Sequence, residues 1–243
     1  MLAAYLFICT FLAYGIKGIT GFGNTLVMNG LFSLRIENRL TSPADLIISL
    51  PTNLWMAWRE RRHLRMRVAL PLSLMLLAGI LPGVFLLKVG NAALLKCVLG
   101  VVIIGMGIEM LTRQNTQKKK PPKGVLFVIG LVSGVLAGMY GIGALLAAYV
   151  SRTTDEPGAF RANLCFVFAV DNVARMILYL ATGILTWQVL GFALFLAPAA
   201  GLGLALSLRF GRRIPVRAVT LVTIGMLIVS GAALVIQNIG ALL

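Results

Sequence analysis

The chain has 243 residues, of which 59% are hydrophobic and only 12% are charged. A soluble domain carries about 25% charged residues, so this composition excludes an ordinary soluble enzyme or regulator. The net charge of +15 comes from 22 Lys and Arg against 7 Asp and Glu. In a membrane protein Lys and Arg gather on the cytoplasmic side, so the excess of positive charge does not indicate nucleic-acid binding.

Eight apolar segments separated by charged or Pro- and Gly-containing loops are predicted to be helices, which makes the chain an all-α polytopic membrane protein. Two of them, 2–34 and 124–150, are too long, because 2–34 as one helix would run roughly 50 Å against a hydrocarbon core of about 30 Å. Each carries a glycine cluster at its centre, which favours a re-entrant hairpin, with a single broken span as the alternative. The other six have the length of a spanning helix: 42–58, 68–87, 92–112, 162–182, 187–208 and 218–237.

The two glycine clusters align at an offset of 120 residues. GITGFGN at Gly18–Asn24 matches GMYGIGA at Gly138–Ala144, and the same offset pairs IleGlyMet at 104–106 with IleGlyMet at 224–226. A shared offset in several segments indicates a duplication. The sequence therefore predicts two repeats, 1–117 and 124–243, joined by a basic linker at 118–123.

The positive charges favour one topology. If all eight segments cross the membrane once, each side receives ten Lys and Arg, whereas two hairpins at the long segments place sixteen on one side and four on the other. The positive-inside rule favours the second arrangement, with both termini periplasmic and three crossings in each repeat. An odd number of crossings makes the repeats inverted, as in many secondary transporters. The loops predicted to be cytoplasmic are 59–67, 113–123, 152–161 and 209–217.

The glycines at the two predicted turns are candidates for binding an anion. Gly21, Gly23, Gly141 and Gly143 allow close approach of the backbone, and backbone N–H groups exposed within a membrane protein attract anions. Their alternative role is to permit tight helix packing. Lys17 lies beside the first cluster, at a depth where a charge is costly and usually functional, unless it reaches the surface or a helix end.

Polar residues at similar depth complete the candidate site. Asp171 and Arg175 share a helix face at the centre of 162–182, where they form either a structural ion pair or a site in which Arg175 binds the anion and Asp171 exchanges a proton. Asn53 and Asn172 offer neutral hydrogen bonds, or else serve helix packing. Asn24 and Thr25 are expected to cap the returning half-helix and to face the substrate.

No residues of an active site or metal centre can be assembled from the sequence. His63 is the single histidine and lies among arginines, and the three cysteines are in apolar stretches without metal-ligand spacing. No P-loop motif is present. We therefore predict neither an enzyme nor a cofactor, and we expect any transport to be coupled to an ion gradient or to the gradient of the substrate.

With these motifs the sequence resembles the TauE/SafE sulfite exporter family, also called DUF81 or the toluene-sulfonate uptake permease group. The resemblance rests on GITGFGN and GMYGIGA, on the ArgGluArgArgHis loop at 59–63 followed by LeuProGly at 81–83, and on the GlyMet-containing last helix of each repeat. It implies transport of small organosulfur anions across the bacterial inner membrane. Where this sequence reads Asn24-Thr25 and Ala144-Leu145, family members often have further glycines.

The resemblance and the residues together predict a secondary transporter, an exporter of sulfite or organosulfonates, with the lipid bilayer and a small anion as its partners and no nucleic acid. Three alternatives remain open: an uptake permease for a different small anion, a non-transporting membrane subunit of a larger complex, and a membrane-embedded enzyme, which the lack of a catalytic set disfavours. The sequence leaves a homodimer open as well.

Overall fold

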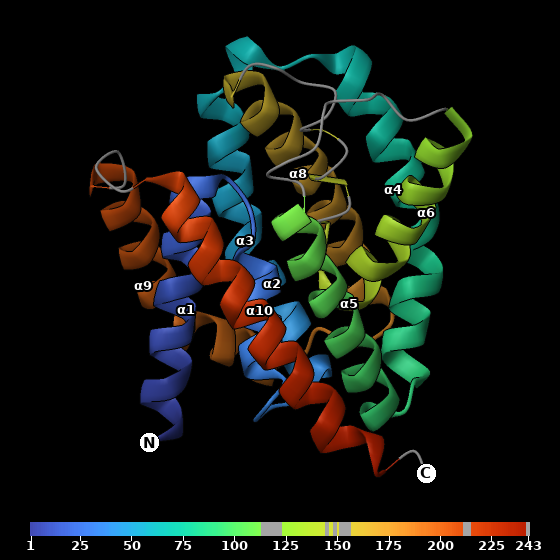
Figure 1. The fold of residues 1–243 in the computed structure, drawn as a ribbon. Helices are drawn as coiled ribbons and strands as arrows, with labels where there is room; N and C mark the ends of the chain where they lie inside the picture. Colours follow the sequence, from blue (N-terminus) through green and yellow to red (C-terminus); the bar gives the residue numbers. More distant parts are fainter. Residues whose placement is uncertain (113–122, 144–145, 148–149, 151–156, 211–214, 242–243) are drawn as a thin grey trace. The chain divides into compact units, whose positions relative to one another are not determined.

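The computed structural model describes residues 1–112, 123–143, 146–147, 150, 157–210 and 215–241, and the elements assigned within them are helices. They are grouped in two compact units, unit 1 with residues 1–44, 90–116 and 187–243 and unit 2 with residues 45–89 and 117–186. The predicted linker at 118–123 lies outside the described residues except for Lys123. Figure 1 shows the helices: α1 (Leu2–Thr20), α2 (Asn24–Phe32), α3 (Asn38–Arg59), η1 (Arg61–His63), α4 (Met66–Val89), α5 (Ala92–Thr112), α6 (Lys123–Tyr140), α8 (Pro157–Ala181), α9 (Trp187–Phe210) and α10 (Val216–Ile239).

Six of the described helices are long and apolar enough to cross a membrane: α1, α4, α5, α8, α9 and α10. Five of them coincide with predicted spans. The predicted span 42–58 lies within α3, which does not reach this hydropathy because its buried side chains include many polar ones. By contrast, α1 does reach the hydropathy of a membrane span, although the sequence favoured a re-entrant hairpin for the segment 2–34 that contains it.

Unit 1 holds two pairs of helices in contact. In the first pair, α1 runs parallel to α9, and a Cβ on Gly203 would lie 2.3 Å from the Phe11 carbonyl oxygen. In the second pair, α5 packs against α10, with Gly100 beside Gly231 and Gly107 beside Ile228. Because the numbers rise along α5 while they fall along α10, this pair is antiparallel.

Unit 2 is built on a close contact between α4 and α6. Cβ atoms on Gly79 and Gly83 would lie 2.4 and 2.3 Å from carbonyl oxygens of α6, and Gly134 and Gly138 make the reciprocal approach to α4. Small residues let helix backbones approach in membranes. The side chain of α8 residue Asn163 accepts a hydrogen bond from the Arg65 backbone at 2.8 Å, so α8 begins beside the connection between α3 and α4.

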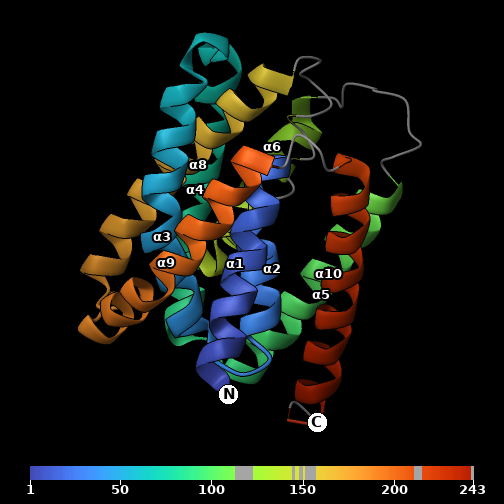
Figure 2. The same ribbon diagram turned by 90° about the vertical axis from the view of Figure 1, so that its left-hand side faces the viewer.

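The first long segment is broken where the glycines predicted it. Helix α1 ends at Thr20, Gly21 and Gly23 adopt φ angles of 87° and 93°, and α2 follows. Left-handed φ values are accessible to glycine at little cost. The Tyr5 hydroxyl donates to the Leu31 carbonyl at 2.8 Å, so the chain turns back and α2 lies beside α1 (Figure 2).

The second long segment breaks at the corresponding position. Helix α6 ends at Tyr140, and Gly141 has a φ of 74° with its N–H donating to the Ala137 carbonyl at 2.7 Å. The same bond joins Gly21 to Lys17 at 2.7 Å. Both helices thus end in a left-handed glycine whose N–H is satisfied by the carbonyl four residues earlier.

Candidate functional site

Helix α3 buries a stripe of polar side chains beside apolar ones such as Leu46 and Met56. Six polar side chains that recur at intervals of one turn are at most 4% exposed: Asn38, Thr41, Ser42, Asp45, Ser49 and Asn53. Buried polar groups cost free energy unless they are hydrogen-bonded, and in a protein that is 59% hydrophobic an apolar face would be the default. A buried polar stripe on a helix of a membrane protein is a candidate for a functional surface.

Helix α8 contributes a buried ion pair to unit 2. The Arg175 Nε and Nη2 atoms donate to Asp171 Oδ2 at 3.0 and 2.8 Å, and each residue is 2% exposed. Nη2 also donates to Asn172 Oδ1 at 2.7 Å, while Asn172 Nδ2 donates to Ser49 Oγ at 3.4 Å. These bonds form a continuous polar chain from Asp171 to the stripe on α3.

Three buried side-chain oxygens in unit 2 have no hydrogen-bond partner among the described residues, and besides Ser133 Oγ on α6 two of them lie in the candidate site. These two are Asp171 Oδ1, on the carboxylate whose other oxygen accepts both bonds from Arg175, and Asn53 Oδ1, one turn along α3 from Ser49. An unsatisfied buried acceptor costs about 1–3 kcal/mol, and such groups are retained where a ligand, water or proton uses them. Both oxygens belong to residues predicted for the site.

The guanidinium of Arg175 is suited to bind an oxyanion. Its planar fork of five N–H donors matches carboxylate or phosphate oxygens in pairs, and the pyramidal or tetrahedral oxygens of sulfite and sulfonates offer similar acceptors. Tyr179 interacts with the same guanidinium and donates from its hydroxyl to the Gly138 carbonyl at 2.8 Å. Hydrogen bonds and contacts therefore connect the polar side chains around Arg175 to α6 as well as to α3.

The turn after α6 lies under an aromatic side chain of α8. A Cβ on Gly143 would lie 2.1 Å from Phe168 Cε1, so the absence of a side chain at Gly143 lets the ring lie against the turn. Gly141 supplies the left-handed backbone there. The two glycines therefore have different roles, one conformational and one steric.

The predicted residues of unit 1 lie at the end of α1 and the start of α2. Lys17 is 1% exposed, with Nζ 5.5 Å from the centroid of the Tyr14 ring. The N-cap of α2 is Gly23, so the prediction that Asn24 and Thr25 cap this helix was wrong: they are its first two residues. Asn24 Nδ2 instead donates to Thr25 Oγ1 at 3.3 Å.

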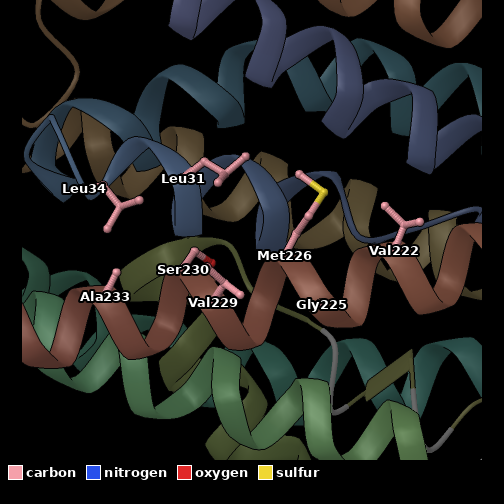
Figure 3. A pocket seen from close by; sticks show the side chains of 8 residues that line it. All are labelled: Leu31, Leu34, Val222, Gly225, Met226, Val229, Ser230 and Ala233. Atoms are coloured by element: carbon pink, nitrogen blue, oxygen red, sulfur yellow. The ribbon is translucent and has the colours of Figure 1, made fainter.

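Unit 1 also contains an apolar pocket of about 400 Å³ between α2 and α10 (Figure 3). Ser230 is the one hydroxyl-bearing residue in its lining, and it donates to the Leu227 carbonyl of its own helix at 3.2 Å. The described residues that line the pocket offer no charged donor, so it does not suit an anion. Its lining residues are Leu31, Leu34, Val222, Gly225, Met226, Val229, Ser230 and Ala233.

Sequence reasoning missed several residues that the structure places in these clusters. Asp45 and Ser49 precede Asn53 at intervals of four residues, and Tyr179 follows Arg175 at the same interval. A search for polar residues with helical period on the apolar segments would have found all three. Phe168 has no such signal, because its contact with Gly143 depends on how α8 packs.

The comparison with known families covers nearly the whole chain. Residues 6–234 match the family described as Sulfite exporter TauE/SafE. The chain belongs to this family. Its members are transporters, so the chain is a multi-pass membrane transporter and not an enzyme. A protein of Cupriavidus necator named probable sulfite/organosulfonate exporter TauE is 26% identical over 229 residues, which is 92% of this chain and 90% of that protein. No solved structure matches the chain.

Proposed function

We propose that this transporter exports sulfite or small organosulfonates across the bacterial inner membrane. The observation that carries the proposal is the buried Arg175 within the membrane helix α8, a side chain suited to bind an oxyanion, in a chain that is similar over 92% of its length to a protein named as such an exporter. A buried cation is expensive at this depth, and an anionic substrate gives a reason for its presence.

The proposed site in unit 2 consists of Arg175, Asn172 and Asn53, with the backbone around Gly141 and Gly143. The positive charge of Arg175 compensates the charge of the anion. The amide N–H groups of the two asparagines donate neutral hydrogen bonds to the oxygens of the anion. In unit 1 the corresponding candidates are a buried cation and the backbone at the break: Lys17, Gly21, Gly23, Asn24 and Thr25. Gly23 caps α2 there, and helix N-termini favour anions.

We further propose the inverted-repeat topology with periplasmic termini. Two contacts support the inverted repeats, because each is incompatible with eight simple crossings, and the excess of Lys and Arg on one side supports the periplasmic termini. The bond from Arg65 to Asn163 brings the 59–67 loop and the start of α8 to one end of unit 2, and α5 runs antiparallel to α10. Eight crossings would put 59–67 and 152–161 on opposite sides, and they would make α5 and α10 parallel.

Flux into proteoliposomes tests the function. We expect protein-dependent movement of sulfite or sulfoacetate, little movement of chloride, and loss of flux in Arg175→Met. Vesicles without protein give the leak, and Gly225→Ala, at a site where an added Cβ meets nothing within 4 Å, serves as the control variant. Leak-level flux for every anion would favour a non-transporting subunit, and uptake in cells instead of export would favour a permease.

Cysteine labelling in cells tests the topology. In a variant with Cys9, Cys97 and Cys165 replaced by alanine, we expect Glu37→Cys to react with an impermeant maleimide from the periplasm. Arg62→Cys, on the exposed loop before α4, should react only after the cells are permeabilised. Protection at Glu37 combined with labelling at Arg62 would overturn the orientation.

A further inference from the structure

The ion pair between Asp171 and Arg175 places a competitor for the anion inside the candidate site. Asp171 Oδ2 accepts both the Nε and the Nη2 bonds of Arg175, which are the paired donors that a sulfonate or sulfite would use. Substrate and carboxylate therefore need the same atoms. An anion that binds Arg175 through this edge has to displace Asp171.

The burial of the pair limits how that displacement can occur. Both side chains are 3% exposed. The carboxylate and the guanidinium together are neutral, and the site stays neutral only if each arriving negative charge is compensated. An anion that entered alone would leave two negative charges against one guanidinium at low dielectric, which is costly. An anion that arrives with a proton keeps the net charge at zero.

Asp171 has an atom ready to accept this proton. Its Oδ1 is buried and has no hydrogen-bond partner among the described residues, while Oδ2 is occupied by Arg175. Protonation of the carboxylate removes its charge and weakens its hold on the guanidinium. Asn172 Oδ1, which accepts from Nη2 at 2.7 Å, keeps Arg175 oriented during the exchange.

The titratable groups near the pair lie on α8 itself and on the other helices of unit 2. The Asp171 carboxylate interacts with Arg175 through charge and hydrogen bonding. The Arg175 guanidinium interacts in the same way with Asp171 and Tyr179. The remaining charged or titratable residues of the described helices of unit 2, α8 included, are Asp45, Arg59, Arg61, Arg62, His63, Arg67, Lys88, Lys123, Tyr140, Arg161 and Cys165.

We propose that Asp171 couples anion binding to protonation: one proton binds Asp171 as one anion takes its place on Arg175, so that the binding step is electroneutral, the two leave the cell together, and the outward gradient of the substrate drives export. The proposal rests on the proposed function, and it specifies how that site is coupled. In this step no covalent bond to the substrate forms or breaks. The proton comes from solvent, the carboxylate becomes a carboxylic acid, and the anion forms the two hydrogen bonds that Asp171 gives up.

Calorimetry with methanesulfonate tests the step on the purified full chain in lipid nanodiscs. This probe stays ionised between pH 5 and 8, so its own charge is constant. We expect uptake of about one proton per anion, measured in buffers of different ionisation enthalpy, and a dissociation constant that rises about tenfold per pH unit above the pKa of the free site. Uptake of no proton, with an affinity independent of pH, would overturn the coupling while the transport function stands.

Two variants distinguish a failure of the proposed proton coupling from a failure of the proposed transport function. Asp171→Asn should bind methanesulfonate without proton uptake and with an affinity independent of pH, whereas Glu37→Gln, the same change at an exposed carboxylate, should behave as the unmodified protein. Asp171→Asn with normal proton uptake would contradict the proposal. If that variant does not fold, the proton count of the unmodified protein decides the matter. Absence of binding or flux with methanesulfonate and sulfite alike would count against the proposed function itself.

Discussion

The two glycine-broken segments carry the same pattern of glycines but use it differently. After α1, Gly21 and Gly23 both adopt left-handed φ angles, and an added Cβ on Gly23 would meet only Ile16, at 3.8 Å. After α6, Gly141 alone has a left-handed φ, while Gly143 makes room for Phe168. The first turn is thus determined by backbone conformation and the second also by packing. The repeated motif breaks the helix in both segments, but the glycines at equivalent positions have different structural roles.

The largest effects are expected where helix backbones touch, in the pairs that hold each broken segment. Gly83→Ala and Gly203→Ala each place a Cβ 2.3 Å from a backbone carbonyl oxygen, which cannot move without separating α4 from α6 or α1 from α9. Overpacking of this kind costs about 1–3 kcal/mol or more. We expect a clear loss of thermal stability in detergent for both, and none for Gly105→Ala and Gly225→Ala, where an added Cβ meets nothing within 4 Å.

The next effect distinguishes the two turns. Gly143→Ala should destabilise the protein by about 1–3 kcal/mol through its clash with Phe168. Phe168→Leu should restore part of the lost stability in the double variant, and the coupling between the two changes can be measured as a cycle. The same leucine should not rescue Gly23→Ala. Equal behaviour at the two positions would show that the turns do not differ.

A smaller effect is common to both turns. Gly21→Ala and Gly141→Ala force a residue with a Cβ into the left-handed region, which costs about 1–2 kcal/mol. Gly21→Asn and Gly141→Asn should be milder, because asparagine tolerates this conformation better than alanine. Thermal unfolding of the four variants measures the difference. If alanine is tolerated as well as glycine, the left-handed turn does not determine stability.

The smallest expected effect concerns Lys17, a charged residue beside the first turn whose equivalent position beside the second turn is uncharged. Lys17 is buried at the end of α1, and the residue 120 positions later is Ala137. Lys17→Met keeps the length and the apolar stem, so we expect the protein to fold and the KM for sulfite to rise about tenfold, the loss of one charged hydrogen bond. An unchanged KM would remove Lys17 from the site.

Much of the fold follows from local properties of the sequence. Length and hydropathy predicted most of the spanning helices, and the glycine clusters predicted both breaks, because continuous apolar runs and left-handed glycines are features of neighbouring residues. The polar chain from Asp171 to Arg175 was also predictable, since residues four apart share a helix face. The partner of Asn172 was not, because Ser49 comes from another helix, 123 residues away.

The sequence by itself determined that this protein is an all-helical membrane protein with two broken segments, an acidic and a basic residue on one face of 162–182 and a strong excess of positive charge. Tertiary structure decided which polar side-chain groups are satisfied and which are not. Among the residues that the structure describes, Asp171 Oδ1 and Asn53 Oδ1 lack partners while Asp171 Oδ2 accepts two bonds, and this depends on the positions of α3 and α8. Hydrogen bonding is directional and acts over about 3 Å, so only the packed helices reveal it.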